Sequence, residues 1–173
     1  MVNRMNSDLA NDFGNLAQRV LSMINKNCEG TVPTPALLSV DDGALLVTAR
    51  ELVDKMRAAM DVQGIHHALT AMWEVVGDAN RYVDAQAPWG LKKTDPERMA
   101  TVLYVLAEVI RHLAILAQPV VPDAAARMLD QLAVPEQQRS FDSLGDQEML
   151  LPGTALPKPQ GIFPRYSGAE EDA

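Results

Sequence analysis

The sequence has few of the residues on which covalent or metal chemistry is usually built. Cys28 is the only cysteine among 173 residues, so neither an internal disulfide nor a cysteine-based zinc site can form within the chain. His66 and His67 are adjacent and would point about 100° apart on a helix, which disfavours a shared metal. No glycine-rich phosphate loop and no carboxylate pair stand out. We therefore expect no catalytic residue and no metal ligand in this chain.

Long apolar runs and a basic excess are also absent. No apolar run approaches the roughly 20 residues that span a bilayer, and the first residues lack the apolar segment of a signal peptide. These absences predict a cytoplasmic protein with no membrane partner. The net charge of −8 disfavours a general nucleic-acid binder, so DNA is not an expected partner. The first 119 residues hold 11 Lys/Arg against 14 Asp/Glu, which leaves room for a local basic patch.

Apolar residues recur at steps of three and four along most of the chain, which is typical of amphipathic helices. The predicted helices span residues 3–27, 41–61, 62–87, 94–118 and 122–132, with a weak one over 135–144. Asp41 is the expected N-cap of the second helix, and Thr94 with Glu97 forms the expected capping box of the fourth. The fourth helix is apolar around most of its circumference and should be the central one. The pattern predicts an all-α, antiparallel bundle of about five helices over residues 1–145.

Residues 146–173 differ in composition from the predicted bundle. Four prolines at positions 152, 157, 159 and 164 disfavour a helix, so this tail should be extended. The tail nevertheless keeps five large apolar residues, more than a disordered linker usually carries: Leu150, Leu151, Leu156, Ile162 and Phe163. We expect it to dock on another surface.

One polar feature lies on the first predicted helix. Asn11, Asn15 and Arg19 follow an i, i+4, i+8 spacing, so they form a stripe that borders the apolar one. Asn and Arg are side chains that read base edges with paired donors and acceptors. The same spacing also fits an ordinary solvated helix face, and the pattern alone does not choose between the two.

The second feature is the tripeptide Ala87-Pro88-Trp89 at the end of the third predicted helix. Proline fixes its own φ and pushes the preceding residue out of helix geometry, so Trp89 is held on a rigid corner. A large flat ring there either plugs the core or forms a platform for an unstacked base. An arginine, two asparagines and a corner tryptophan together would suit a loop of single-stranded RNA.

Four segments of the chain carry a resemblance to a known family. They are "NDFGNLAQRVLSMINKN", "ANRYVDAQAPWGLKK", "LAILAQPVVPDAAARML" and "GIFPRY". Together they resemble the C-terminal anticodon-binding domain of bacterial methionyl-tRNA synthetases, over residues 2 to 166. The resemblance implies a helical bundle of the class I synthetase type that grips the anticodon loop of a methionine tRNA.

The resemblance also implies roles for individual residues. Asn15 and Arg19 would hydrogen-bond base edges of the CAU anticodon, and Trp89, held by Pro88, would stack on an unstacked base. Asn11 and Gln86 are possible supporting residues of the same site.

A full enzyme of this family has an N-terminal nucleotide-binding domain with "HIGH"-like and "KMSKS"-like motifs and often a zinc knuckle. None of these motifs occurs in the 173 residues. We therefore expect ATP and zinc to belong to a catalytic domain supplied in cis or in trans, and no activity of this chain alone. The tail would dock on that domain, so Leu151, Leu156, Ile162 and Phe163 are expected to be poorly packed here. The alternative function is a helical protein-interaction module that has lost tRNA binding.

Overall fold

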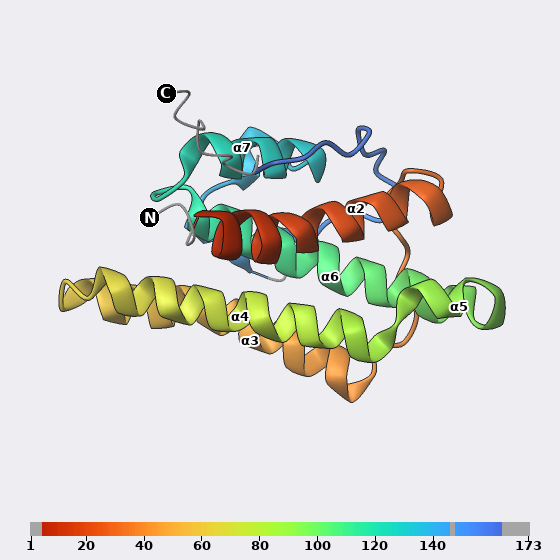
Figure 1. The fold of residues 1–173 in the computed structure, drawn as a ribbon, viewed down its shortest axis with the longest axis horizontal. Coiled ribbons are helices and arrows are strands. Elements are labelled where there is room, and N and C mark those ends of the chain that lie inside the picture. The colour runs from red at the N-terminus through yellow and green to blue at the C-terminus, as the bar shows by residue number, and fades with distance from the viewer. Residues whose placement is uncertain (1–4, 146–147, 164–173) are drawn as a thin grey trace, which may run out of the picture.

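The chain folds into a bundle of helices, and the computed structural model describes residues 5–145 and 148–163 (Figure 1). The helices are η1 (Met5–Gly14), α2 (Asn15–Asn27), α3 (Val40–Asp61), α4 (Ile65–Gln86), α5 (Pro88–Thr94), α6 (Pro96–Ala117), α7 (Pro122–Gln131), η2 (Glu136–Gln138) and η3 (Phe141–Leu144). Within these residues the β-structure is an isolated antiparallel bridge between Thr31 and Ala155. The predicted all-α bundle is therefore confirmed.

Helix α6 is the centre of the bundle, as its apolar sequence predicts. It contacts α2, α3, α4 and α7, and every residue from 101 to 117 is buried. The α3–α4 pair covers one side of α6, and α2 and α7 cover the other, while η1 contacts α2 and α4 (Figure 1). By length and composition α6 could cross a membrane, but 94% of its apolar window is buried inside the protein. It is the core helix of the bundle.

Three polar side chains are buried on α6 and fasten the C-terminal segment to it. Arg111 Nη1 donates to the Ser143 carbonyl (2.8 Å), and its Nε donates to Glu108 Oε1 (2.9 Å). Glu108 Oε2 in turn accepts the Leu150 amide (3.0 Å). His112 Nδ1 lies 3.0 Å from the Glu108 carbonyl oxygen. Its Nε2 lies 3.1 Å from the carbonyl oxygen of Leu144, the last residue of η3. Burial lowers the pKa of His112. Because buried polar groups need partners, this network fixes where the chain returns after α7.

Two predicted helix caps are displaced by one or two positions. Helix α3 is capped by Ser39, not Asp41, and Asp42 completes a reciprocal capping box three residues after the cap. Helix α6 is capped by Asp95, whose carboxylate accepts the Arg98 amide at 2.9 Å. The predicted box of Thr94 and Glu97 is thus wrong. Several neighbouring Ser, Thr and Asp residues can serve as caps, and only the chain path selects among them.

Two further segments differ from the prediction. The connector between the predicted helices over 62–87 and 94–118 forms the short helix α5. The weak helix expected over residues 135–144 is a pair of 3₁₀ turns, η2 and η3. Pro88 favours the start of α5, because a proline at the first helical position has no N–H to leave unpaired.

The first helix changes from a π-helix to an α-helix along its length. Residues Met5–Gly14 are π-helical and the α-helix begins at Asn15. A side chain at Gly14 would place its Cβ 2.8 Å from the Leu9 carbonyl oxygen and 3.0 Å from the Phe163 ring. A glycine is therefore needed at this junction. Although π-helical bonds reach the fifth residue, not the fourth, Asn11 and Asn15 still line one cleft.

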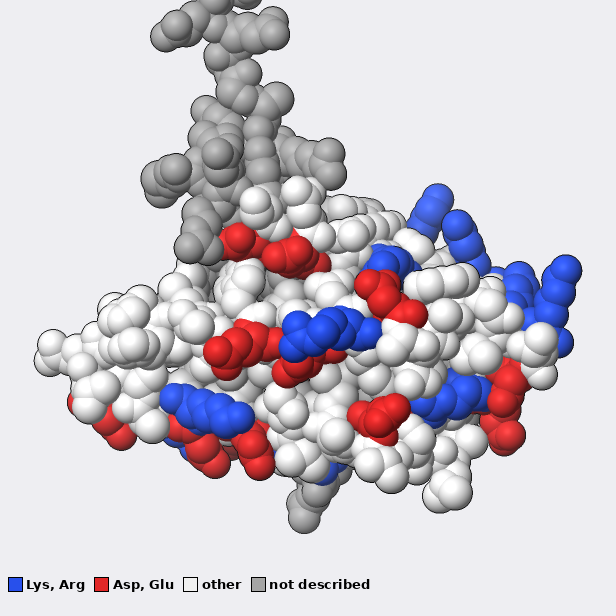
Figure 2. All heavy atoms as spheres, turned by 60° about the horizontal axis from the view of Figure 1, so that its bottom comes forward, with Lys and Arg blue, Asp and Glu red and all other residues white. Residues whose placement is uncertain are grey.

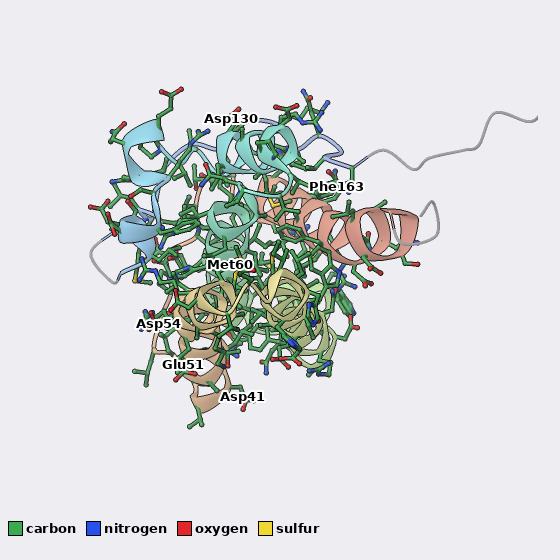
Figure 3. The ribbon with its side chains drawn as sticks, turned by 90° about the vertical axis from the view of Figure 1, so that its left-hand side faces the viewer. Asp41, Glu51, Asp54, Met60, Asp130 and Phe163 are labelled. Atoms are coloured by element: carbon green, nitrogen blue, oxygen red, sulfur yellow. The ribbon has the colours of Figure 1, made fainter. Side chains whose placement is uncertain are left out.

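The tail packs on the bundle, which corrects the expectation that its apolar residues lack a surface in this chain. Ile162 is buried, and Leu156 and Phe163 pack against the core. The Phe163 ring lies beside the first helix, with its centroid 6.2 Å from that of Phe13 (Figure 3). Leu151 remains exposed, as expected. The reason is that η1, α7 and the loop after α2 together offer a surface for residues 148–163. Pro164, Arg165 and Tyr166 of the "GIFPRY" segment lie outside the described residues.

Candidate functional site

The corner after α4 places a tryptophan on the surface. Ala87 adopts a left-handed conformation (φ 43°, ψ 55°), which ends α4 and turns the chain. Pro88 is buried and opens α5. Trp89 follows with 54% of its surface exposed. The interpretation of Trp89 as a core plug is therefore wrong, and the ring is available as a flat platform.

Arg19 reaches from α2 to the helix that ends at this corner. Its Nη1 pairs with Asp84 Oδ1 at 3.2 Å, and its Nη2 donates to Asn80 Oδ1 at 3.4 Å. Asn80 is itself oriented by a bond from its amide nitrogen to the Val76 carbonyl (3.1 Å). The Arg19 Nε is buried without a protein partner. The guanidinium is therefore held in place by α4 while part of its donor set stays unused.

Sequence reasoning missed Asp84 and Asn80 as partners of Arg19. Their i, i+4 spacing on α4 puts them on one helix face, and Asp84 lies five residues before Trp89. This spacing is the sequence signal for the two partners of Arg19, but it does not show that α2 packs against that face of α4.

Asn11 and Asn15 are exposed and line a cleft with a volume of about 400 Å³. Gln18 lines the same cleft, and its Oε1 is buried without a partner. The opposite wall is formed by tail residues 161–163. The structure therefore brings the two asparagines together in one polar cleft, and Trp89 is not among the residues that line it.

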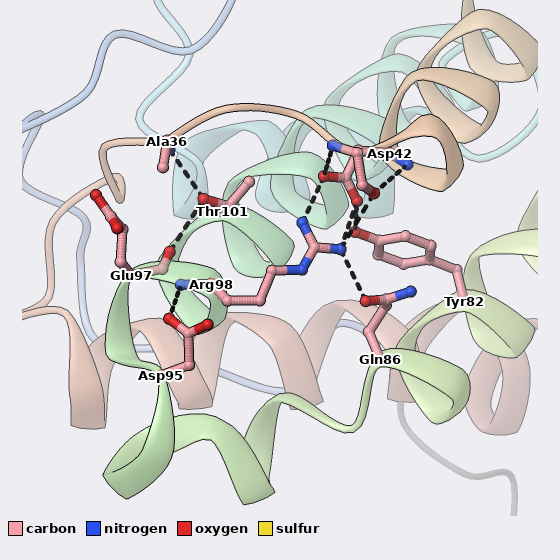
Figure 4. A network of polar contacts seen from close by, with 9 residues as sticks. Ala36, Asp42, Tyr82, Gln86, Asp95, Glu97, Arg98 and Thr101 are labelled. Carbon is pink, nitrogen blue, oxygen red and sulfur yellow. Dashed lines mark hydrogen bonds and ion pairs between the residues drawn. The ribbon is translucent and has the colours of Figure 1, made fainter.

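Gln86 lies in a different environment from the two asparagines. Its Oε1 accepts a hydrogen bond from Arg98 Nη2 at 2.7 Å (Figure 4). The same guanidinium donates to both carboxylate oxygens of Asp42, at 2.5 and 2.8 Å, and Tyr82 donates to Asp42 Oδ1 at 2.5 Å. Gln86 thus belongs to a polar cluster of Asp42, Tyr82, Gln86 and Arg98, which we call the Asp42 cluster.

The electrostatics of the Asp42 cluster favour the ionised carboxylate. Burial of Asp42 opposes ionisation, but hydrogen bonds from Arg98, Tyr82 and Ser39 outweigh burial, so the pKa of Asp42 lies well below its usual value. Burial and the neighbouring carboxylate raise the pKa of Tyr82. The cluster is therefore a charge-assisted pair with a neutral phenol attached.

Basic side chains gather at the end of the molecule where α5 lies. Figure 2 shows Lys and Arg interspersed with Asp and Glu over most of one face, with several blue side chains grouped at that end. Lys92 and Lys93 of α5 are both exposed, three and four residues after Trp89. On the outer side of α3, by contrast, acidic residues such as Glu51 and Asp54 pair with basic neighbours (Figure 3). A local basic patch thus lies next to the exposed ring.

The surroundings of Cys28, the only cysteine of the chain, do not activate its thiol. Cys28 is the C-cap of α2, and burial raises the pKa of its thiol, which disfavours the reactive thiolate. Within residues 5–145 and 148–163 no three His, Cys, Asp or Glu side chains gather as metal ligands do.

Comparison with known proteins identifies the family. Residues 32–173 match the family "anticodon binding domain of methionyl tRNA ligase". The methionine–tRNA ligase of Brucella suis is 55% identical over 99% of this chain and 33% of its own length. That of Mesorhizobium japonicum is 54% identical over 96% of this chain and 32% of its own length. The chain thus spans about a third of the length of the curated relatives it matches.

Solved structures agree with the sequence comparison. The free form of Mycobacterium tuberculosis methionyl-tRNA synthetase superposes with a TM-score of 0.92 and 49% identity, over 96% of this chain and 34% of that one. Its complex with methionyl-adenylate superposes with a TM-score of 0.91 and 48% identity. Both the helical fold and the sequence are shared, so this chain belongs to the family of anticodon-binding domains of methionyl-tRNA ligase.

Proposed function

We propose that this chain binds the anticodon loop of a methionine tRNA and reads its CAU triplet for aminoacylation. The observation that carries the proposal is Trp89, which stands 54% exposed on a corner fixed by a buried proline. An exposed, rigid aromatic ring is a suitable platform for one unstacked base. Lys92 and Lys93 beside it supply positive charge for the phosphates.

The other candidate residues have distinct roles in this proposal. Arg19, whose side chain is partly exposed, is the candidate for contact with a base edge, and Asp84 and Asn80 fix its orientation. Asn15 presents its amide from the first turn of α2. Asn11 and Gln86 support the site, Asn11 from the cleft and Gln86 through Arg98.

In this proposal the rest of the ligase acts outside the 173 residues. The catalytic domain, in cis or in trans, binds ATP, methionine and any zinc, and this chain alone does not aminoacylate. The whole assembly works in the cytoplasm. The alternative, a protein-interaction module that has lost tRNA binding, is not favoured by the close match to the ligase family.

The proposal is tested by binding to a short anticodon stem-loop that bears CAU, beside one with a single changed anticodon base. We expect tighter binding to CAU. Trp89→Ala should weaken that binding by about 1–3 kcal/mol, the usual worth of one base stack. Trp73→Phe is the matched control, because it changes the other tryptophan, which is partly buried against the core.

Equal affinity for the two RNAs would leave the chain without anticodon specificity. Unchanged affinity after Trp89→Ala, with the circular dichroism spectrum intact, would remove the stacking role. Failure of both predictions would favour the protein-interaction alternative.

A further inference from the structure

We propose that Arg98 is a positioning residue for Trp89: it clamps Gln86, the last residue of α4, to the start of α6 and so fixes the corner on which the ring stands. This inference rests on the proposed function, because it assigns Arg98 a part in the binding of RNA. Neither the sequence pattern nor the family resemblance pointed to Arg98.

The clamp spans both ends of the segment that carries Trp89. Helix α5 has seven residues and joins α4 to α6. Arg98 is the third residue of α6, and Gln86 precedes the left-handed Ala87. The hydrogen bond from Arg98 Nη2 to Gln86 Oε1, at 2.7 Å, therefore ties the chain just before α5 to the chain just after it. A short helix held at both ends has little freedom to tilt, and its tryptophan keeps one orientation.

Arg98 is itself anchored more strongly than a surface arginine would be. Its guanidinium forks onto both oxygens of the fully buried Asp42 carboxylate, and its own amide donates to the Asp95 cap. Such bidentate, charge-assisted pairs are short and directional. Asp42 is held in turn by the Ser39 amide and the Tyr82 hydroxyl. The anchor is thus built from α3, α4 and α6 together, and the Gln86 bond transmits its rigidity to the corner.

A non-glycine residue in left-handed geometry explains why such a clamp is needed. Ala87 has φ 43°, a conformation that is unfavourable for a residue with a Cβ and persists only when its surroundings hold it. The flanking bonds are the Ala87 amide to the Val83 carbonyl (3.0 Å) and the Gly90 amide to the Ala87 carbonyl (2.8 Å). Both are local to the turn. The Arg98–Gln86 bond adds a tie from a different helix.

The decisive variant is Gln86→Met, which removes the acceptor, keeps the length of the side chain and leaves the Asp42–Arg98 pair in place. Arg98→Lys is the second variant, because a lysine keeps the charge facing Asp42 but cannot fork to Asp42 and Gln86 together. Gln118→Met is the matched control. Gln118 also bridges two segments through its amide, but at the opposite end of α6.

We expect Gln86→Met and Arg98→Lys each to weaken binding of the CAU stem-loop by about three- to thirty-fold, the usual span of an indirect coupling. Gln118→Met should change it by less than about two-fold. In a double-mutant cycle, Gln86→Met should have no further effect once Trp89 is alanine, because its influence passes through the ring. Equal losses with and without Trp89 would mean that Gln86 touches the RNA itself, which would overturn the inference.

A second readout tests the clamp without RNA. In a Trp73→Phe background Trp89 is the only tryptophan, so its time-resolved fluorescence anisotropy reports the motion of that ring. Gln86→Met should lower the residual anisotropy, and Gln118→Met should not. If Trp89→Ala leaves RNA affinity intact but the anisotropy falls as expected, the proposed function fails and the clamp stands. If the anisotropy is unchanged in Gln86→Met, the clamp is wrong whatever the RNA result.

Discussion

At the scale of single residues, the Asp42 side chain serves three structural roles. It closes the capping box of α3, accepts a forked pair from Arg98 and accepts the Tyr82 hydroxyl. Its carboxylate is fully buried, so removing its partners or its charge leaves polar groups without compensation. The position cannot be replaced by a neutral residue without a cost to folding.

The first prediction concerns the pH dependence that Asp42 confers. Because its folded-state pKa is lowered, its contribution to stability is fully present above the unfolded pKa of about 3.9 and is lost as pH falls towards the folded value. Asp42→Asn should lower the free energy of unfolding by about 3–5 kcal/mol near pH 7. Below pH 4 the difference in the free energy of unfolding between Asp42→Asn and the wild-type chain should narrow by up to about 1.4 kcal/mol per pH unit.

Urea unfolding at several pH values measures this gap. Asp54→Asn, which changes an exposed carboxylate on the same helix, serves as the control and should show a nearly constant, small difference. A gap for Asp42→Asn that stays constant from pH 7 to pH 3 would contradict the lowered pKa.

At the scale of elements, the tail from residue 148 onwards is bonded to the bundle at several points. The Val32 amide donates to the Thr154 carbonyl (2.8 Å), and the Gly153 amide donates back to the Val32 carbonyl (2.8 Å). The Leu156 amide donates to the Gly30 carbonyl (2.8 Å). Backbone bonds of this kind, next to a buried Leu150, should slow amide exchange in the tail.

The second prediction tests that attachment at Gly153. Its φ of +84° suits glycine, and a Cβ there would meet no atom within 4 Å, so a substitution acts through the backbone alone. Gly153→Ala should cost about 1–2 kcal/mol and speed exchange at the Val32 amide. Gly161→Ala is the matched control in the same tail, since it also has open space around it and no left-handed φ. Equal stability of the two variants would mean that the turn at Gly153 does not hold the tail.

At the scale of the whole molecule, the charge is acidic in total but not uniform. The net charge is −8, yet Lys92 and Lys93 stand exposed on α5 beside Trp89. Under the proposed function, this small basic patch grips only a few nucleotides, so binding should show a shallow salt dependence, because few counterions are released.

The third prediction follows from this distribution. In the logarithmic plot of the stem-loop binding constant against salt concentration, Lys92→Gln and Lys93→Gln should each reduce the slope by about 0.7 per lost phosphate contact. They should weaken CAU and the changed RNA alike, because phosphate contacts carry no sequence information. Lys55→Gln makes the same charge change where Glu51 already pairs with the lysine, and it should leave the slope unaltered. A loss confined to CAU would make these lysines base contacts.

The helical class, the central position of α6 and the rigid corner at Pro88 can be predicted without a structure, because apolar periodicity and proline geometry are local properties of the chain. The sequence also identifies Trp89 as a candidate platform for a base. The exposure of Trp89 depends on what packs around α5. Caps were predicted within two residues, since Ser39 and Asp95 compete with equally suitable neighbours until the chain path is set.

The contacts between distant groups, by contrast, depend on how the helices pack. Arg19 pairs with Asp84, which lies sixty-five residues away in the sequence. Arg98 of α6 bonds both Asp42 of α3 and Gln86 of α4. The tail, expected to lack a surface, returns to η1 and α7. These pairings follow from how amphipathic faces pack against one another, and no spacing along the chain encodes that arrangement, since each helix face could have met several partners of similar polarity.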